Sequence, residues 1–133
     1  MPRMIFVNLP VDDLAKSRAF FSGLGFEFND VFSDANAASL VVSEQAIVML
    51  LLRPFFARFT RKEVAGPTVT EAALVLSADS RDEVDDLVER ALALGASPAG
   101  EAQDEGYMYG RSFHDLDGHL WEFIWMDPAA AQG

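Results

Sequence analysis

A helix that ends in glycine occurs twice in this chain. The stretches "LAKSRAFFSGLGF" (14–26) and "VDDLVERALALGA" (84–96) align so that Gly25 falls on Gly95. An apolar strand-length run precedes each helix, and three such runs follow it. Internal duplication at this period is informative about architecture. We therefore predict an α+β fold of two βαβββ modules, which form a curved, cup-like mixed sheet with both helices on its outer face.

The element boundaries follow from apolar runs and turn residues. In the first module we expect a strand at 4–9 and a helix with Asp12 as its N-cap, followed by strands at 26–32, 38–43 and 47–52. In the second we expect a strand at 72–78, a helix that starts with a Ser80–Glu83 capping box, and strands at 98–102, 107–113 and 119–126. Together they form one domain, 1–133, with module one at 3–53, a connector at 54–68, module two at 69–128 and a tail at 129–133.

The composition narrows the possible partners. With 10 basic and 21 acidic residues the net charge is −11, and such a chain repels the phosphates of nucleic acid. No apolar run approaches the roughly 20 residues of a membrane span, and "MIFV" near the start is too short for a signal peptide. The chain has no cysteine, which suits the cytoplasm. We expect a cytoplasmic protein with a small-molecule ligand and neither a nucleic-acid nor a membrane partner.

Two stretches resemble a known superfamily. The stretch "FVNLPVDDLAKSRAFFSGLGF" (6–26) resembles the N-terminal sequence pattern of the vicinal oxygen chelate superfamily, and "SFHDLDGHLWEFIWMDP" (112–128) resembles its C-terminal pattern. That group includes glyoxalase I, extradiol dioxygenases, fosfomycin resistance enzymes and bleomycin resistance proteins. The resemblance covers residues 4–128 and implies the glyoxalase/bleomycin resistance/dihydroxybiphenyl dioxygenase fold. Because members commonly dimerise, it also implies a homodimer.

The resemblance further implies where a metal would bind. In the superfamily, each module lends residues from its first and last strands to a cup, where a divalent metal usually sits. Carried over to this sequence, the four ligand positions fall on Phe6, Met49, the region of Ala73, and Glu122. Of these residues, only Glu122 has a side chain of the type that binds divalent metals. We therefore expect no cofactor, and a divalent metal held by Glu122 is the alternative.

Glu122 raises a question of its own because it interrupts the apolar run 120–126. A carboxylate in such a run needs a partner or solvent. A four-residue turn at 115–118 would place Arg111 opposite Glu122 on the neighbouring strand, so that the two charges pair. Metal ligation and acid–base catalysis by Glu122 are the alternatives.

Strand parity extends this prediction to a pocket wall. Asn8 shares a face with Phe6, and Tyr107 and Tyr109 share a face with Arg111. Apolar groups with a few polar ones are typical of small-molecule pockets. The predicted pocket residues are Phe6, Asn8, Met49, Tyr107, Tyr109, Arg111 and Glu122. The alternative is that the two tyrosines only cover a core.

The connector "RPFFARFTRKEVAG" (53–66) reverses the overall charge, since it carries four basic residues and one acidic one. One interpretation is a lid over the cup that receives an anionic or aromatic ligand. The other is a linker helix whose phenylalanines pack on the sheet or on a partner subunit. The candidate lid residues are Phe55, Phe59, Arg58 and Arg61.

Two functions remain open at this level. The ligand count favours a binding or sequestering protein that resembles bleomycin resistance proteins, with an incomplete metal site. The alternative is an enzyme that uses Glu122, either a metal-dependent glyoxalase I-like lyase or an extradiol dioxygenase-like protein.

Overall fold

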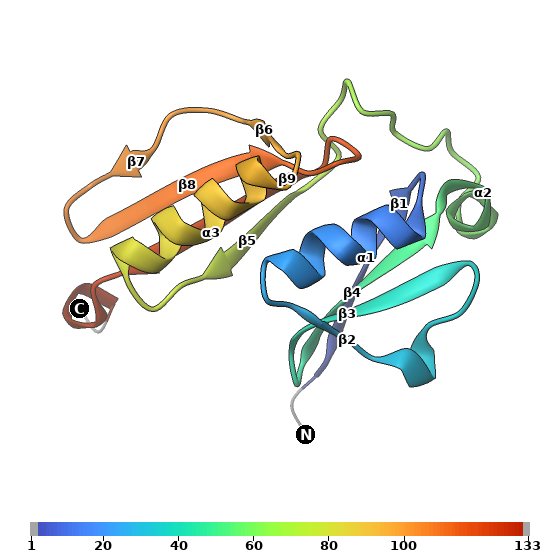
Figure 1. The fold of residues 1–133 in the computed structure, drawn as a ribbon, viewed down its shortest axis with the longest axis horizontal. Coiled ribbons are helices and arrows are strands. Elements are labelled where there is room, and N and C mark those ends of the chain that lie inside the picture. The colour runs from blue at the N-terminus through green and yellow to red at the C-terminus, as the bar shows by residue number, and fades with distance from the viewer. Residues whose placement is uncertain (1–2, 132–133) are drawn as a thin grey trace. The chain divides into compact units, whose positions relative to one another are not determined.

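The computed structural model describes residues 3–131. The chain forms two compact units, Met1–Ala65 and Gly66–Gly133, and the boundary falls inside the predicted connector. Each unit consists of a mixed sheet with one long helix against one face (Figure 1). The predicted α+β class with a repeated strand–helix–strands order is confirmed.

The first unit holds a four-stranded sheet in the order β1-β4-β3-β2. Its strands are β1 (Ile5–Val11), β2 (Glu27–Phe28), β3 (Ala37–Ser43) and β4 (Ala46–Leu52), and its long helix is α1 (Leu14–Gly23). β1 runs parallel to β4, whereas β3 is antiparallel to both β4 and β2. The first unit also contains the short helices η1 (Asp30–Phe32), α2 (Arg53–Phe56) and η2 (Ala57–Phe59), and the second unit ends with the short helix α4 (Pro128–Ala131).

The core of the first unit lies between α1 and the sheet. Alternate residues of β1, β3 and β4 point toward the helix, and burying such a side chain stabilises the fold by about 1.5–3 kcal/mol. The buried apolar residues include Leu9, Val11, Phe20, Phe21, Leu24, Leu40, Val48 and Leu50. The opposite face of the same strands carries apolar side chains that are exposed, such as Met4 and Phe6. The candidate site lies on this second face of the sheet.

The start of α1 differs from the prediction by one residue. The N-cap is Asp13, whose carboxylate accepts a 3.0 Å hydrogen bond from the backbone N–H of Lys16. Asp12 instead forms a 3.2 Å ion pair with Arg53, the first residue of α2. The helix ends as expected, because Gly25 has a φ of 98°, a left-handed conformation that glycine adopts without steric penalty.

The predicted strand at 26–32 is largely wrong. Only Glu27 and Phe28 pair with β3, and the chain then turns into η1. Asn29 causes the turn, since its side chain accepts a hydrogen bond from the N–H of Val31. Such a local bond gives the backbone an alternative to the strand ladder.

The second unit holds a five-stranded sheet in the order β5-β9-β8-β6, with β7 also paired to β8. The strands are β5 (Ala73–Ser77), β6 (Ser97–Pro98), β7 (Gln103–Asp104), β8 (Met108–His114) and β9 (Leu120–Met126), and the helix is α3 (Arg81–Ala93). β5 runs parallel to β9, and β8 is antiparallel to β9. The strand predicted at 98–102 is largely wrong, because pairing with β8 stops at Pro98 and resumes only at Gln103.

Helix α3 begins with the predicted capping residues. The N–H of Glu83 donates a 3.0 Å bond to the Ser80 hydroxyl, and the Glu83 carboxylate accepts a bond from the N–H of Asp79. The apolar side of α3 packs on β8 and β9. The core there includes Val84, Val88, Ala91, Phe113, Trp121 and Phe123.

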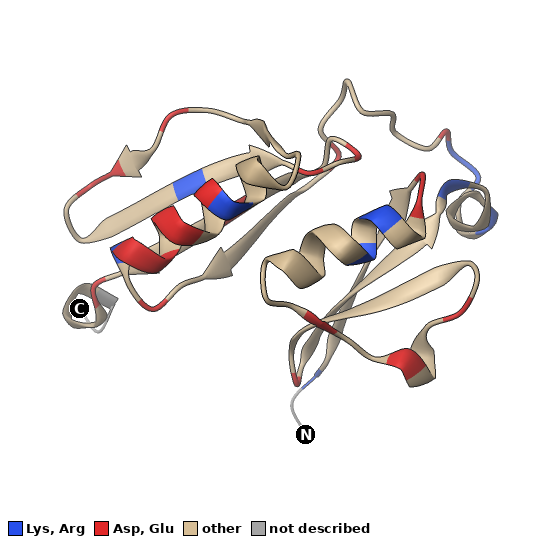
Figure 2. Cartoon of the chain, viewed as in Figure 1, with Lys and Arg blue, Asp and Glu red and all other residues tan. Residues whose placement is uncertain are grey.

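Charge is unevenly distributed over these elements. Figure 2 shows acidic residues concentrated on α3 and basic residues on α2 and the segment that follows it. Of the helices in residues 3–131, none has the length and apolar character needed to cross a membrane.

Candidate functional site

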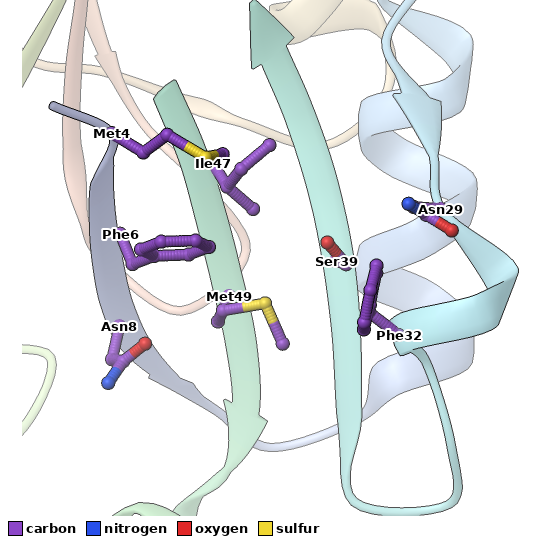
Figure 3. Close-up of a pocket in the computed structure, with 8 residues that line it drawn as sticks. All are labelled: Met4, Phe6, Asn8, Asn29, Phe32, Ser39, Ile47 and Met49. Carbon is purple, nitrogen blue, oxygen red and sulfur yellow. The ribbon is translucent and has the colours of Figure 1, made fainter. Parts of the chain in front are cut away.

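The sheet face of the first unit that is opposite α1 is hollowed into a pocket of about 570 Å³. This volume is within the range of about 300–1,000 Å³ that small-molecule sites occupy. Figure 3 shows side chains from β1, β3, β4 and the η1 region around it. The lining residues are Met4, Phe6, Asn8, Asn29, Phe32, Ser39, Ile47 and Met49.

The pocket is apolar with a few uncharged polar groups. No Asp, Glu, Lys, Arg or His is among its lining residues. Phe6 and Phe32 are 58% and 67% exposed, so their rings present apolar surface to the pocket and to solvent. Asn8 makes no side-chain hydrogen bond to another described residue, which leaves its amide available to a ligand.

The predicted residues Phe6, Asn8 and Met49 therefore belong to one pocket. They meet because β1 and β4 pair in parallel with Asn8 next to Met49, so that residues of equal parity share the face. The structure adds five residues that the sequence reasoning did not select. Met4 and Ile47 could have been found by extending the parity argument, and Ser39 by pairing β3 with β4 opposite Met49. Asn29 and Phe32 could not, because they reach the pocket only through the turn at η1.

Glu122 belongs to a second, smaller pocket of about 290 Å³ in the second unit. It is lined by Ala73, Val75, Ala99, Gly100, Glu101, Gln103, Ser112, Leu120 and Glu122. The Glu122 carboxylate lies beside Gly110, where an added Cβ would come within 3.4 Å of Oε1. The side chain is half-buried and makes no hydrogen bond or ion pair with another described residue.

The predicted pairing of Arg111 with Glu122 is wrong by one residue. β8 and β9 are paired so that Arg111 is opposite Phe123 and Ser112 is opposite Glu122. The cause is the turn, which has three residues (116–118) and not four. The Asp115 N–H donates to the carbonyl of His119, and Gly118 takes a left-handed φ of 84°. A type I turn followed by a left-handed residue is a common three-residue hairpin.

This register moves Arg111 and Tyr109 to the helix-covered face. The Arg111 guanidinium forms ion pairs with Asp85 at 3.1 Å and with Glu89 at 2.8 Å, both on α3. The Tyr109 hydroxyl donates a 2.6 Å bond to Asp85. Tyr107 precedes β8 and is exposed. These three residues therefore line neither pocket.

The hydrogen bonds to Asp85 shift the pKa values of the groups that form them. The Tyr109 hydrogen bond, followed by the Arg111 guanidinium, holds the pKa of the Asp85 carboxyl below its ordinary value, against the opposite effect of burial. The same hydrogen bond, with burial, raises the pKa of Tyr109. The network thus ties α3 to β8 through a carboxylate that stays ionised.

A buried polar network surrounds the β8–β9 turn. One oxygen of Asp115 accepts bonds from the N–H groups of Asp117 and His119, and the other accepts a 2.8 Å bond from the Trp121 indole. The His119 ring, 4% exposed, lies with Nδ1 2.6 Å from a carboxylate oxygen of Glu71. His119 therefore anchors the turn on the side that α3 covers, where Trp121 and Phe123 also lie.

The residues of this chain do not fit the metal site that the fold family implies. Three of the four expected ligand positions carry Phe6, Met49 and Ala73, which offer no nitrogen or oxygen ligand. Within residues 3–131, no group of three or more His, Cys, Asp or Glu side chains is arranged to hold a metal ion. Glu122 alone cannot supply such a site.

The connector forms α2 and η2 and then an irregular segment. The rings of Phe55 and Phe59 meet edge to face at 5.2 Å, and the Arg58 guanidinium lies 5.7 Å from the Phe55 ring centre. Arg61 is exposed. No connector residue is among those that line either pocket.

Comparison with known proteins agrees with this architecture. Residues 3–123 match the model of the glyoxalase/bleomycin resistance protein/dioxygenase superfamily. No curated protein sequence matches the chain at a significant level.

Solved structures also share the fold. A hypothetical protein from S. aureus is 28% identical, with a TM-score of 0.80 and 94% of each chain covered. A glyoxalase/bleomycin resistance protein/dioxygenase family enzyme from Burkholderia phytofirmans is 17% identical, with a TM-score of 0.78, and the alignment covers 94% of this chain and 99% of that one. A bleomycin resistance determinant encoded on the transposon Tn5 is 19% identical, with a TM-score of 0.65 and coverage of 95% and 99%. The protein described here therefore belongs to the glyoxalase/bleomycin resistance protein/dioxygenase superfamily.

Proposed function

We propose that this chain is a small-molecule-binding protein, of a binding or sequestering kind, whose ligand occupies the pocket of the first unit. The observation that carries the proposal is that pocket: about 570 Å³, mainly apolar, with polar groups from two Asn side chains and a Ser. Similarity to a bleomycin resistance determinant is consistent with such a role. At 19% identity it supports the fold, and the function rests on the site.

The proposal is tested with a set of fluorinated fragments that includes neutral, cationic and anionic members. Binding broadens the fluorine NMR line of a fragment. We expect some members to bind, and Phe6→Ser to abolish their broadening because it removes one wall of the pocket.

Ile5→Ser is the matched control. Ile5 precedes Phe6 on β1, is 60% exposed against 58% for Phe6, and is not among the pocket residues. Fragments should bind this variant as they bind the parent protein. If no fragment binds, or if both variants lose binding equally, the pocket is not a ligand site.

A second function is favoured by one observation, the Glu122 carboxylate, which has no described partner and lines its own pocket. In this alternative the protein is a glyoxalase I-like lyase or an extradiol dioxygenase-like enzyme, and Glu122 moves a proton or binds an added divalent metal. Assays of both reaction types with and without added metal test it. Turnover that Glu122→Gln abolishes would favour the enzyme over the binding protein.

The proposal also includes a cytoplasmic homodimer. The absence of cysteine from the sequence supports the compartment, and family membership supports the assembly. Light scattering at micromolar concentration should give twice the mass of one chain. A mass of one chain would remove the dimer from the proposal.

A further inference from the structure

We infer that the ligand of the first-unit pocket is an uncharged, planar aromatic compound that carries a carboxamide-like hydrogen-bonding group. This inference rests on the proposed function and names its ligand class. Three properties of the pocket carry it, namely its lack of charge, its two free rings and its two side-chain amides.

The absence of charge in the lining disfavours ionic ligands. A charged group that enters an apolar pocket loses hydration, and without a counter-charge this loss is not recovered. None of the eight lining residues is ionisable. Two charged residues adjoin lining residues in sequence. Asp30, which follows Asn29, is exposed and paired with Arg18 at 2.7 Å, and Arg3, which precedes Met4, is exposed and is not among the lining residues. A neutral ligand is therefore favoured over a cation or an anion.

Two phenyl rings favour an aromatic ligand. Figure 3 shows Phe6 and Phe32 on opposite sides of the pocket, with Met49 and Ser39 between them. Neither ring makes a ring–ring or cation–π contact with another described residue.

Other phenylalanines of the same unit do have such partners. Phe20 and Phe21 meet edge to face at 4.9 Å, and Phe28 lies under the Arg18 guanidinium. Aromatic pairs gain about 0.5–1.5 kcal/mol beyond area burial, and methionine sulfur also contacts ring edges favourably. Met4 and Met49 also line the pocket, so their sulfur atoms can contact the ring of a bound ligand.

Two amides specify a hydrogen-bonding group on the ligand. The Asn8 side chain offers one acceptor and two donors. The Asn29 oxygen already accepts from Val31, so its NH₂ group remains as the donor toward the pocket. The two residues come from β1 and from the segment before η1, on either side of the sheet face (Figure 3). A carboxamide can pair with both kinds of group, which a hydrocarbon cannot.

The test compares compounds that differ in one property. Equilibrium dialysis is carried out with naphthamide, naphthoate and naphthylmethylammonium, which share a ring system and differ in charge. Two further compounds complete the series: the analogue of naphthamide whose rings are fully saturated, and naphthalene, which lacks the carboxamide. We expect naphthamide to bind at least about tenfold more tightly than either ion, because an uncompensated charge is costly to bury. The two compounds that lack either the aromatic ring or the amide should bind more weakly than naphthamide.

Variants show whether the compounds bind in this pocket. They also distinguish an error in the ligand class from an error in the proposed function. Phe32→Leu should reduce the preference for the aromatic over the saturated ring, and Asn8→Leu the preference for naphthamide over naphthalene. If an ionic compound binds most tightly and Phe6→Ser removes that binding, the ligand class is wrong while the proposed function stands. If no compound binds and Phe6→Ser instead converts a dimer into single chains, the pocket face is an interface between copies, and both proposals fail.

Discussion

The Asp115 carboxylate and the Trp121 indole are joined by a 2.8 Å hydrogen bond, and both side chains are buried. The bond closes the β8–β9 turn from the inside, because Asp115 also accepts from two backbone N–H groups. It fixes which residues of β9 face α3 and which face the Glu122 pocket.

Replacing Asp115 should therefore destabilise the fold. Asp115→Ala removes the acceptor of the indole and of two backbone donors. Two of these three donors are buried, so we expect a loss of about 2–6 kcal/mol, since each unsatisfied buried donor costs about 1–3 kcal/mol. Asp115→Asn keeps one acceptor oxygen and should lose less. Urea unfolding at neutral pH measures both. Equal effects of the two substitutions would argue against the hydrogen bonds as the cause.

The ion pairs of Arg111 predict a specific pattern of energetic coupling. A double-mutant cycle between Arg111→Leu and Glu122→Leu should give a coupling energy near zero, because the residues lie on opposite faces of the sheet. The cycle between Arg111→Leu and Glu89→Leu should give about 0.2–1 kcal/mol, the range of exposed pairs, because the Glu89 side chain is mostly exposed. A large coupling in the first cycle would show that the strands pair in the other register.

Acid should destabilise the second unit, because two of its carboxyl groups have lowered pKa values in the folded state. Hydrogen bonds from Arg81, and then from the Gly106 N–H, lower the pKa of Asp104 from 3.8 to about 2. The pKa of Asp85 is lowered as well. A lowered folded-state pKa contributes stability above the unfolded value, and this contribution is lost as the pH falls through the folded value. The loss should therefore occur below the ordinary carboxyl range and, for Asp104, continue to about pH 2.

Denaturant midpoints between neutral pH and this acid range measure that effect. Asp104→Asn should lower stability at neutral pH and make the acid slope shallower. The matched control is Asp34→Asn, an exposed carboxyl in the first unit. An unchanged slope in Asp104→Asn would mean that this pair does not contribute to the acid sensitivity.

Protein purified without chelators or an affinity tag should contain less than stoichiometric zinc, nickel, manganese or iron. The reason is the donor set, in which Glu122 is accompanied by Phe6, Met49 and Ala73 at the other family positions. Elemental analysis of the parent and of Glu122→Gln measures it. One tightly held metal per chain, lost in the variant, would contradict this expectation and support the enzyme alternative.

The double substitution Arg58→Ser with Arg61→Ser distinguishes the two interpretations of the connector. Because no connector residue lines the pocket of the first unit, we expect naphthamide binding and the unfolding midpoint to change little. Phe55→Ser should lower the midpoint, since it removes the ring contact with Phe59. Weaker binding in the arginine variant at an unchanged midpoint would instead support a lid.

The sequence predicted the fold more fully than the site. The duplicated helix and glycine pattern depends on local periodicity, which survives without knowledge of tertiary contacts. The site depends on strand register, and a difference of one residue in a turn moves every side chain to the other face. This register determines the ion-pair partners of Arg111, which are Asp85 and Glu89 of α3 and not the predicted Glu122. Gly118 was the available signal, because glycine at the end of a turn favours a left-handed residue there.

The correspondence between the two modules has a consequence for how this protein can change. Ser39 is opposite Met49 in one sheet, and Ser112 is opposite Glu122 in the other, so the same structural position holds a thioether in one module and a carboxylate in the other. A duplicated module lets one copy vary its recognition chemistry while the other keeps its own. Protein engineers can exploit this independence: substitutions at Met49 and its neighbours can retune ligand preference without redesigning the Glu122 pocket.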